Sequence, residues 1–71
     1  MKEGVLFYNQ ENGRIGISFD DGMSDDGLHC GKAMEVKIDG KWIPARIEMN
    51  KKQWYLVGIT VESLRALRVR V

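Results

Sequence analysis

Turn-forming residues recur at short intervals along this chain. Their spacing is the sequence feature that most strongly limits the folds available to the chain. Glycine and asparagine tolerate positive φ angles, and Asp-Gly or Asn-Gly steps favour turns. Such residues stand at Asn9, Asn12-Gly13, Asp21-Gly22, Asp26-Gly27, Gly31, Asp39-Gly40, Asn50 and Gly58. The runs between them are rich in Val, Ile, Phe, Tyr and Trp, which strands prefer. Short strands at regular spacing predict an all-β barrel or sandwich.

Alternation within these runs predicts which side chains face the core. Apolar residues recur at every second position, as in strands that are buried on one side. The strands expected in this way span residues 4–9, 14–19, 33–38, 41–49 and 53–59. The core-facing residues in the middle three are Ile15, Ile17, Phe19, Met34, Val36, Ile38, Ile43, Ala45, Ile47 and Met49. Asp39-Gly40 is the strongest short-range signal for a type I′ hairpin, so we expect such a turn there.

The end of the chain departs from this pattern. Thr60 is a suitable cap for a single helical turn that ends at Leu64 or Ala66, before a last strand over 67–71. We therefore expect residues 1–71 to form one domain, a small SH3-like barrel of five or six strands with one short helical turn before the last strand. Closure of the barrel reduces exposed sheet edges. An OB-like barrel is the alternative, although this chain is short for it.

Length and composition restrict the class of protein further. A chain of 71 residues buries only about 60% of the surface that its unfolded form exposes. A single cysteine excludes an intramolecular disulfide framework and suits a reducing compartment. No apolar run approaches the ~18–20 residues of a membrane span, and the start, MKEGVLFYNQ, lacks the apolar stretch of a signal peptide. We expect a cytoplasmic domain with no membrane contact.

Charge is unevenly distributed, although the net charge is only +1. Residues 1–36 hold three Lys or Arg against seven Asp or Glu, a net of −4, and residues 37–71 hold eight against three, a net of +5. This asymmetry predicts either an acidic and a basic face or, if the strands of the two halves interleave, no net separation of charge. The small net charge gives no global attraction to nucleic acid.

The segment FDDGMSDDGLHCGK, residues 19–32, holds the only His and the only Cys, so it is the first place to look for a metal or a catalyst. A calcium loop of the EF-hand type fails in both registers, because Lys32 or Gly31 stands where the twelfth-position Glu is required. Zinc needs about four ligands, and a second Cys or His does not exist. We expect a solvated loop without metal, in which the exposed residues are Asp20, Asp21, Asp25 and Asp26.

The same segment is a poor candidate for catalysis. Nucleophilic Cys–His chemistry needs the imidazole to reach the thiol, which the neighbours His29 and Cys30 rarely achieve. Carboxylates on an open loop also keep ordinary pKa values unless they are buried. We therefore expect no catalytic residue and no cofactor. His29 is interpreted as a half-buried residue at a strand entry, and Cys30 as a small core residue.

A second group of residues points to binding. Alternation places Trp42, Pro44, Arg46 and Glu48 on one face of their strand, opposite the apolar core residues. An exposed Trp beside Arg is typical of a protein-binding surface, and Trp54 of the next strand is expected to join it. The alternative is that Trp42 covers an open barrel end or stacks on Arg46. A Pro in a strand is also expected at an edge or a bulge.

The third group is basic and consists of Lys51, Lys52, Arg65, Arg68 and Arg70. Basic residues with aromatic neighbours are able to hold single-stranded nucleic acid, and the alternative is a solvated face. We expect a non-enzymatic interaction module that binds another protein or a copy of itself, with a nucleic-acid-binding module as the alternative. The expected binding residues are Trp42, Arg46, Trp54, Arg68 and Arg70.

Several motifs resemble a known family. They are GLHCG at 27–31, EV at 35–36, WIPARIE at 42–48 and WYLVG at 54–58, and FYNQENGRIGISFDDG and LRALRVRV also fit. Together they resemble a small bacterial domain family of unknown function, found in Gram-positive bacteria and their mobile elements. The resemblance covers nearly the whole chain. It implies no activity, substrate or cofactor.

Overall fold

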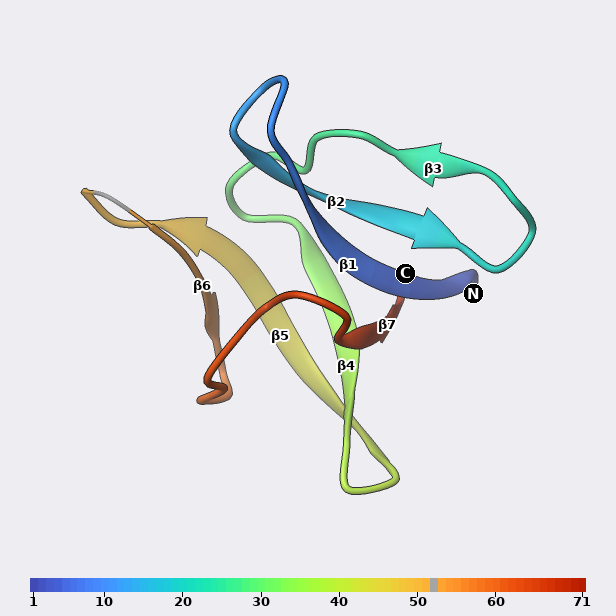
Figure 1. Cartoon of the computed structure of the whole chain (residues 1–71). Coiled ribbons are helices and arrows are strands. Elements are labelled where there is room, and N and C mark those ends of the chain that lie inside the picture. Colours follow the sequence, from blue (N-terminus) through green and yellow to red (C-terminus); the bar gives the residue numbers. More distant parts are fainter. Residues whose placement is uncertain (52) are drawn as a thin grey trace.

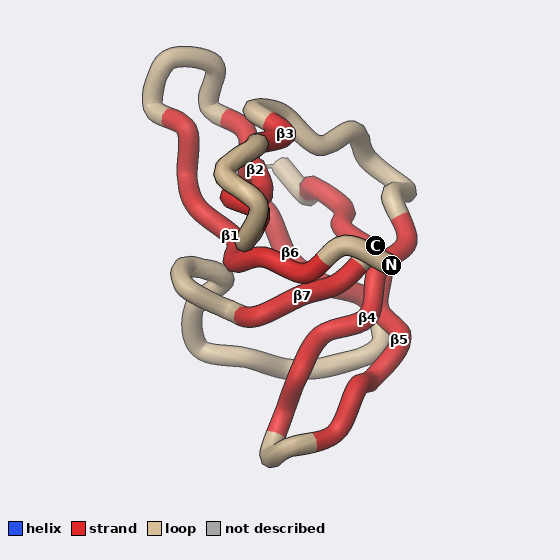
Figure 2. Tube along the Cα trace, turned by 90° about the vertical axis from the view of Figure 1, so that its right-hand side faces the viewer, coloured by secondary structure: helices blue, strands red, loops and turns tan. Residues whose placement is uncertain are grey.

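The chain folds into one antiparallel sheet of seven strands, seen in a computed structural model that describes residues 1–51 and 53–71 (Figure 1). The strands are β1 (Glu3–Asn9), β2 (Arg14–Phe19), β3 (Ser24–Asp25), β4 (Ala33–Ile38), β5 (Lys41–Met49), β6 (Trp54–Val57) and β7 (Arg68–Arg70). Their order in the sheet is β3-β2-β1-β7-β4-β5-β6. The described part contains no helix, as Figure 2 shows. Lys52, one of the expected basic residues, lies outside the described residues.

Two hairpins supply most of the sheet, and their turns follow from the sequence. β1 pairs with β2 from Gly4↔Phe19 to Asn9↔Arg14, and β4 pairs with β5 around the turn at residues 39–40. Asp39 has φ = 51° and Gly40 has φ = 78°, so both central residues are left-handed. A type I′ turn requires this conformation, and the predicted hairpin is therefore confirmed.

The short last strand joins the two hairpins. Val69 of β7 lies opposite Gly4 of β1 on one side and Val36 of β4 on the other. The chain ends meet beside it, because Lys2 and Val71 exchange backbone hydrogen bonds of 2.8 and 2.9 Å. Figures 1 and 2 show the two termini side by side.

One apolar core fills the concave side of the twisted sheet. Its buried residues are Leu6, Ile15, Ile17, Leu28, Met34, Val36, Ala45, Ile47, Leu56 and Val69. The predicted alternation is right for most of them, since Ile17, Val36 and Ile47 are fully buried. Met49 differs: it lies on the predicted face but at the open end of the strand, where it is 43% exposed.

Two expectations about the fold need correction. The closed SH3-like barrel is not confirmed, because the edge strands β3 and β6 do not pair and the sheet stays open. The predicted helical turn is wrong: the segment from Thr60 to Ala66 is not helical, and its apolar residues Val61 and Leu64 pack against the core instead. Tertiary packing here outweighs the local capping signal of Thr60.

The strand count also exceeds the expected five or six. The additional strand, β3, has only two residues and pairs Ser24 with Ser18 and Asp25 with Ile17. It falls inside the acidic segment that the sequence predicts to be a loop. So short a strand has no apolar period of its own, and only its contact with β2 reveals it.

Candidate functional site

The convex face of the sheet brings three of the predicted binding residues together, namely Trp42, Arg46 and Arg70. β7 lies next to β4, and β4 lies next to β5, so Glu35 stands opposite both Arg70 and Pro44. Lys37 stands opposite Trp42 in the same way. The basic last strand and the Trp strand therefore share one surface. We call this surface the Trp42 face and define it by Glu35, Lys37, Trp42, Arg46, Glu48 and Arg70.

Trp42 is held in place by cations rather than by the core. The guanidinium carbon of Arg70 lies 4.4 Å from the centroid of the Trp42 ring, and the Lys37 ammonium lies 5.7 Å from it. Glu35 fixes the arginine through two hydrogen bonds, from Nε to Oε1 at 3.1 Å and from Nη2 to Oε2 at 3.2 Å. A guanidinium over an indole is attracted by the ring quadrupole. The stacking partner is thus Arg70 and not Arg46.

Arg46 makes a separate contact on the same strand. Its Nε donates to Glu48 Oε2 at 2.8 Å, and its side chain is about half exposed. Pro44 lies between Arg46 and Trp42 on this strand, and it is exposed. β6 ends at Val57, opposite Arg46, so the side of Pro44 that lacks an N–H has no strand beside it. β5 itself lies between β4 and β6, so the expected edge position holds only in that the β5–β6 pairing stops before Pro44.

The charges of the two halves of the chain interleave. Arg68 lies 2.9 Å from Asp20 and 3.7 Å from Glu3, and the hydrogen bond to Asp20 raises the pKa of Arg68 above its ordinary value. Arg70 is paired with Glu35 in the same manner. The basic second half thus finds its counter-charges in the acidic first half. The charge distribution predicted either separate acidic and basic faces or no net separation of charge. Around β7 the structure shows no separation of charge.

An apolar hollow of about 310 Å³ adjoins the Trp42 face. The side chains that make it apolar are Met1, Ala33, Pro44 and Val71, and Lys32 and Glu35 stand at its rim. Met1 is 78% exposed. The hollow gives the charged and aromatic face an adjoining apolar region.

Trp54 lies on the other side of the sheet, so the expectation that it joins Trp42 is wrong. Trp54 pairs with Met49, which is a core-facing position. Its indole N–H donates to the carbonyl oxygen of Gly13 at 2.8 Å, and the ring packs against the core. This bond links β6 to the turn between β1 and β2 across the open side of the sheet.

The four aspartates of the acidic segment are exposed, as predicted, and their side chains serve local structure. Asp21 accepts from the Met23 N–H at 2.9 Å and lies 3.1 Å from Lys2. These contacts, the backbone bond first, hold the pKa of Asp21 below its ordinary value. Within the described residues, no three His, Cys, Asp or Glu side chains gather as a metal site would require. His29 and Cys30 are both exposed, so their interpretation as half-buried and core residues is wrong.

Glu35 and Lys37 are the site residues that the sequence pattern missed. Both belong to an outward-facing set on their strand, but nothing local distinguishes them from a solvated face. Their roles depend on which strand lies beside β4, and β7 comes from the far end of the chain. Residues 35, 37 and 70 can be identified as neighbours of Trp42 only when the strand order is known.

Taken together, the sheet and its surface define the chain as a small all-β domain with a mixed-charge aromatic face. Among the described residues, there is no helix long and apolar enough to span a bilayer. Residues 4–71 match the family described as Domain of unknown function (DUF5348), and the chain belongs to this family.

A solved structure supports the same assignment. The crystal structure of a protein from Ruminococcus gnavus, a structural genomics target, has 51% sequence identity and a TM-score of 0.90. The match covers 97% of this chain and 99% of that chain. No curated protein matches. The predicted resemblance to a small bacterial family of unknown function is confirmed to this extent, and the link to mobile elements stays a prediction.

Proposed function

We propose that this domain is a non-enzymatic interaction module that binds another protein, or a copy of itself, through the Trp42 face. The observation that carries the proposal is the stack of Arg70 on Trp42, with Glu35 holding the guanidinium by two hydrogen bonds. Tryptophan and arginine are the residues most enriched among those that dominate binding energy. Because both side chains are already fixed, little conformational entropy is lost when a partner binds.

The surroundings of the stack support a protein partner. The apolar hollow beside Pro44 and Ala33 gives an apolar centre, and the Arg46–Glu48 pair gives a polar rim. Interfaces between proteins combine these two features. A nucleic-acid partner needs free cations, whereas Arg68 and Arg70 are both engaged by carboxylates.

The test compares three forms of the full chain: wild type, Trp42→Ala and Lys41→Ala. Each is immobilised and exposed to a lysate of the native host, and retained proteins are quantified by mass spectrometry. The affinity of any protein retained by wild type is then measured directly, and self-association is measured by sedimentation. Lys41→Ala is the matched control, because Lys41 is exposed, adjacent to Trp42 in sequence, and paired with Ile38 rather than with a residue of the Trp42 face.

We expect Trp42→Ala to weaken the measured affinity by about 2 kcal/mol or more, which is roughly 30-fold, while Lys41→Ala changes it little. The binding should also change only modestly with salt. Affinity that is equal in wild type and Trp42→Ala contradicts the proposal. Affinity that falls by orders of magnitude between low and physiological salt identifies phosphate-driven binding and contradicts it as well.

A further inference from the structure

The edge strand β6 has backbone groups without a partner among the described residues. Its neighbour Ile47 uses its own backbone elsewhere, exchanging bonds of 2.8 and 3.0 Å with residues 31–32 on the side away from β6. In an antiparallel ladder, alternate residues turn their N–H and C=O groups to opposite sides. Leu56 lies opposite Ile47, so the backbone groups of Leu56 and Trp54 face the open edge of the sheet.

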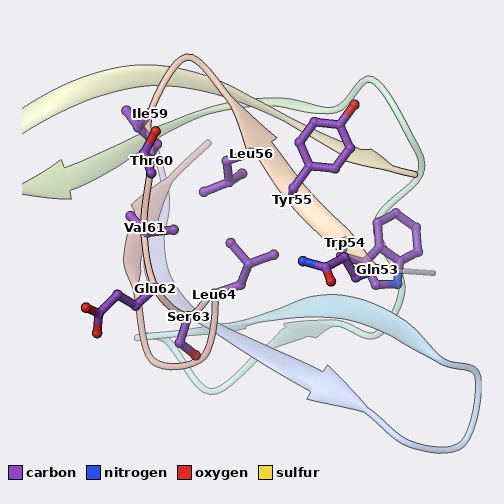
Figure 3. Close-up of a pocket in the computed structure, with 10 residues that line it drawn as sticks. All are labelled: Gln53, Trp54, Tyr55, Leu56, Ile59, Thr60, Val61, Glu62, Ser63 and Leu64. Carbon is purple, nitrogen blue, oxygen red and sulfur yellow. The ribbon is translucent and has the colours of Figure 1, made fainter. Parts of the chain in front are cut away.

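The chain that follows β6 runs beside this edge without closing it. Residues 58–63 make no backbone hydrogen bond to any other described residue. A hollow of about 290 Å³ separates them from β6. In Figure 3 the side chains of Leu56, Val61 and Leu64 point into this hollow from both walls. The edge is therefore bordered by a hollow of mixed lining, in which aliphatic side chains stand beside polar groups of Gln53, Thr60 and Ser63.

A second hollow of about 280 Å³ adjoins the first. The two share Gln53, Trp54, Ser63 and Leu64. The second adds residues at the open end of the sheet, of which Tyr8 is 40% and Met49 is 43% exposed. We call these two adjoining hollows together the Trp54 groove and define it by the edge of β6 together with Tyr8, Met49, Val61, Leu64 and Arg65.

Charge differs between the two ends of the Trp54 groove. Arg65 borders the second hollow, with its guanidinium carbon 5.7 Å from the centroid of the Tyr8 ring. It is exposed and forms no salt bridge with a described carboxylate. Glu62 borders the first hollow. The groove thus offers an unpaired cation at one end, apolar walls in the middle and an acid at the other end.

We propose that the Trp54 groove binds an extended segment of a partner protein, which adds to β6 as a further strand. The free N–H and C=O groups of Trp54 and Leu56 bond to the backbone of the segment. Its alternate side chains are apolar and enter the hollows, and one carboxylate meets Arg65. In strand addition, main-chain bonds supply affinity and the side-chain pockets supply specificity.

The chemistry of the groove favours a peptide over single-stranded nucleic acid. Nucleic acid requires a positively charged track along its backbone, whereas this groove carries Arg65 at one end and Glu62 at the other. The aliphatic walls also match side chains better than bases. The Trp54 groove lies on the concave side of the sheet and the Trp42 face on the convex side. The inference therefore goes beyond the proposed function and does not depend on it.

The experiment selects binders from a phage library of short random peptides on the immobilised full chain at physiological salt. The enriched peptides are synthesised, and their dissociation constants are measured by fluorescence anisotropy. Backbone amide shifts of the ¹⁵N-labelled domain locate the site. We expect the enriched peptides to alternate apolar and polar residues, to carry an Asp or Glu towards one end, and to shift the amides of residues 54–64.

Two variants and one chemical modification sharpen the result. Arg65→Glu should weaken binding of the acidic peptide about tenfold, since a hydrogen bond to a charged group is lost. Lys41→Glu makes the same charge change outside both hollows and should leave binding unchanged. N-methylation of the peptide should abolish binding at alternate residues only, because only every second amide of an added strand bonds to β6. The N-methylation experiment uses the wild-type domain, so its result does not depend on whether a variant folds.

Four results overturn the inference. The first is a selection that enriches no peptide above background. The second is binding that shifts only amides around Trp42 and Glu35. The third is N-methylation that is tolerated at every position of the peptide. The fourth is an oligothymidine that competes with the peptide at equal concentration, because it identifies the groove as a site for bases.

Discussion

Trp42 shows how a single side chain is placed by a pattern and fixed by residues that the pattern does not reach. The two-residue period of its strand assigns Trp42 to the face opposite the core, and the structure agrees. What holds the indole there is a guanidinium from the last strand and a carboxylate from the fourth. The period of one strand contains no information about either, because both contacts join segments far apart in sequence.

A double-mutant cycle on Trp42→Ala and Arg70→Ala measures how strongly the two side chains interact. We expect a coupling energy of about 1 kcal/mol in urea unfolding, between the values for exposed and for desolvated cation–π pairs. The same cycle on Trp42→Ala and Arg46→Ala is the control and should give a coupling near zero. Equal coupling in the two cycles contradicts the stack described above.

Asp21 predicts how stability responds to acid. Its pKa is lowered in the folded chain, first by the Met23 N–H and then by Lys2. A lowered folded pKa means that the unfolded chain binds the proton more readily. The stabilisation is therefore complete above the unfolded pKa and is lost as the pH falls through the folded pKa. Asp21→Asn should remove this part of the acid dependence.

The measurement is the urea midpoint of wild type and Asp21→Asn from about pH 6 to about pH 2. Lys2→Ala is the comparison variant, and because the Met23 backbone bond is the largest single cause and remains in place, this variant should retain part of the acid dependence of wild type. The effect is modest, since the carboxylate is exposed and screened by salt. Parallel curves for wild type and Asp21→Asn at every pH contradict the assignment.

At the scale of elements, local signals define the two hairpins. The apolar period predicts β2, β4 and β5 at their observed bounds, because each buries one face in a shared core. Asp39-Gly40 predicts the turn between the last two, because its left-handed conformation is a property of the two residues themselves. Such elements are predictable since their cause lies within a few residues.

Gly40→Val should destabilise the domain by about 1 kcal/mol or more. The cause is the backbone, because Gly40 has φ = 78° and a Cβ at that position meets no other atom within 4 Å. Gly40→Asn is the matched control, since Asn tolerates left-handed φ, and it should retain most of the stability. The measurement is the urea midpoint. Equal midpoints for the Val variant and wild type contradict a type I′ turn.

The elements that the sequence misassigned depend on distant contacts. Thr60 resembles a helix cap, yet Val61 and Leu64 gain more by packing on the core than one isolated helical turn gains from its hydrogen bonds. Trp54 was assigned to the wrong face because its facing depends on the register between β5 and β6. A shift of one residue in that register reverses every side chain of β6.

Ala66 gives a test of the segment that leads into β7. It has φ = 64°, a left-handed conformation that costs an alanine roughly 1–2 kcal/mol. Ala66→Gly should therefore raise the stability by about 0.5 kcal/mol, after the extra entropy of an unfolded glycine is subtracted. Ala45→Gly, in a buried strand, is the contrasting control and should lower it. A loss of urea stability in Ala66→Gly as large as that in Ala45→Gly contradicts this conformation.

At the scale of the whole molecule, strand order decides what the surface presents. The acidic and basic halves of the sequence suggest two charged faces until β7 is placed between β1 and β4. That placement sets Arg68 beside Asp20 and Arg70 beside Glu35. Pairing between strands that are far apart in sequence cannot be inferred from local patterns. The composition of the Trp42 face was therefore predictable only in part, because β7 reaches it through such pairing. The Trp54 groove was not predictable, since three separate segments form it.

The central claim is that Trp42 serves a contact surface and not the core, and Trp42→Ala tests it most directly. Unfolding and association of this one variant are measured against wild type, by urea denaturation and by sedimentation or partner titration. We expect a loss of about 1 kcal/mol in stability, from the lost stack, and about 2 kcal/mol or more in association. A stability loss of roughly 3–5 kcal/mol, the scale of a large core truncation, with unchanged association contradicts the claim.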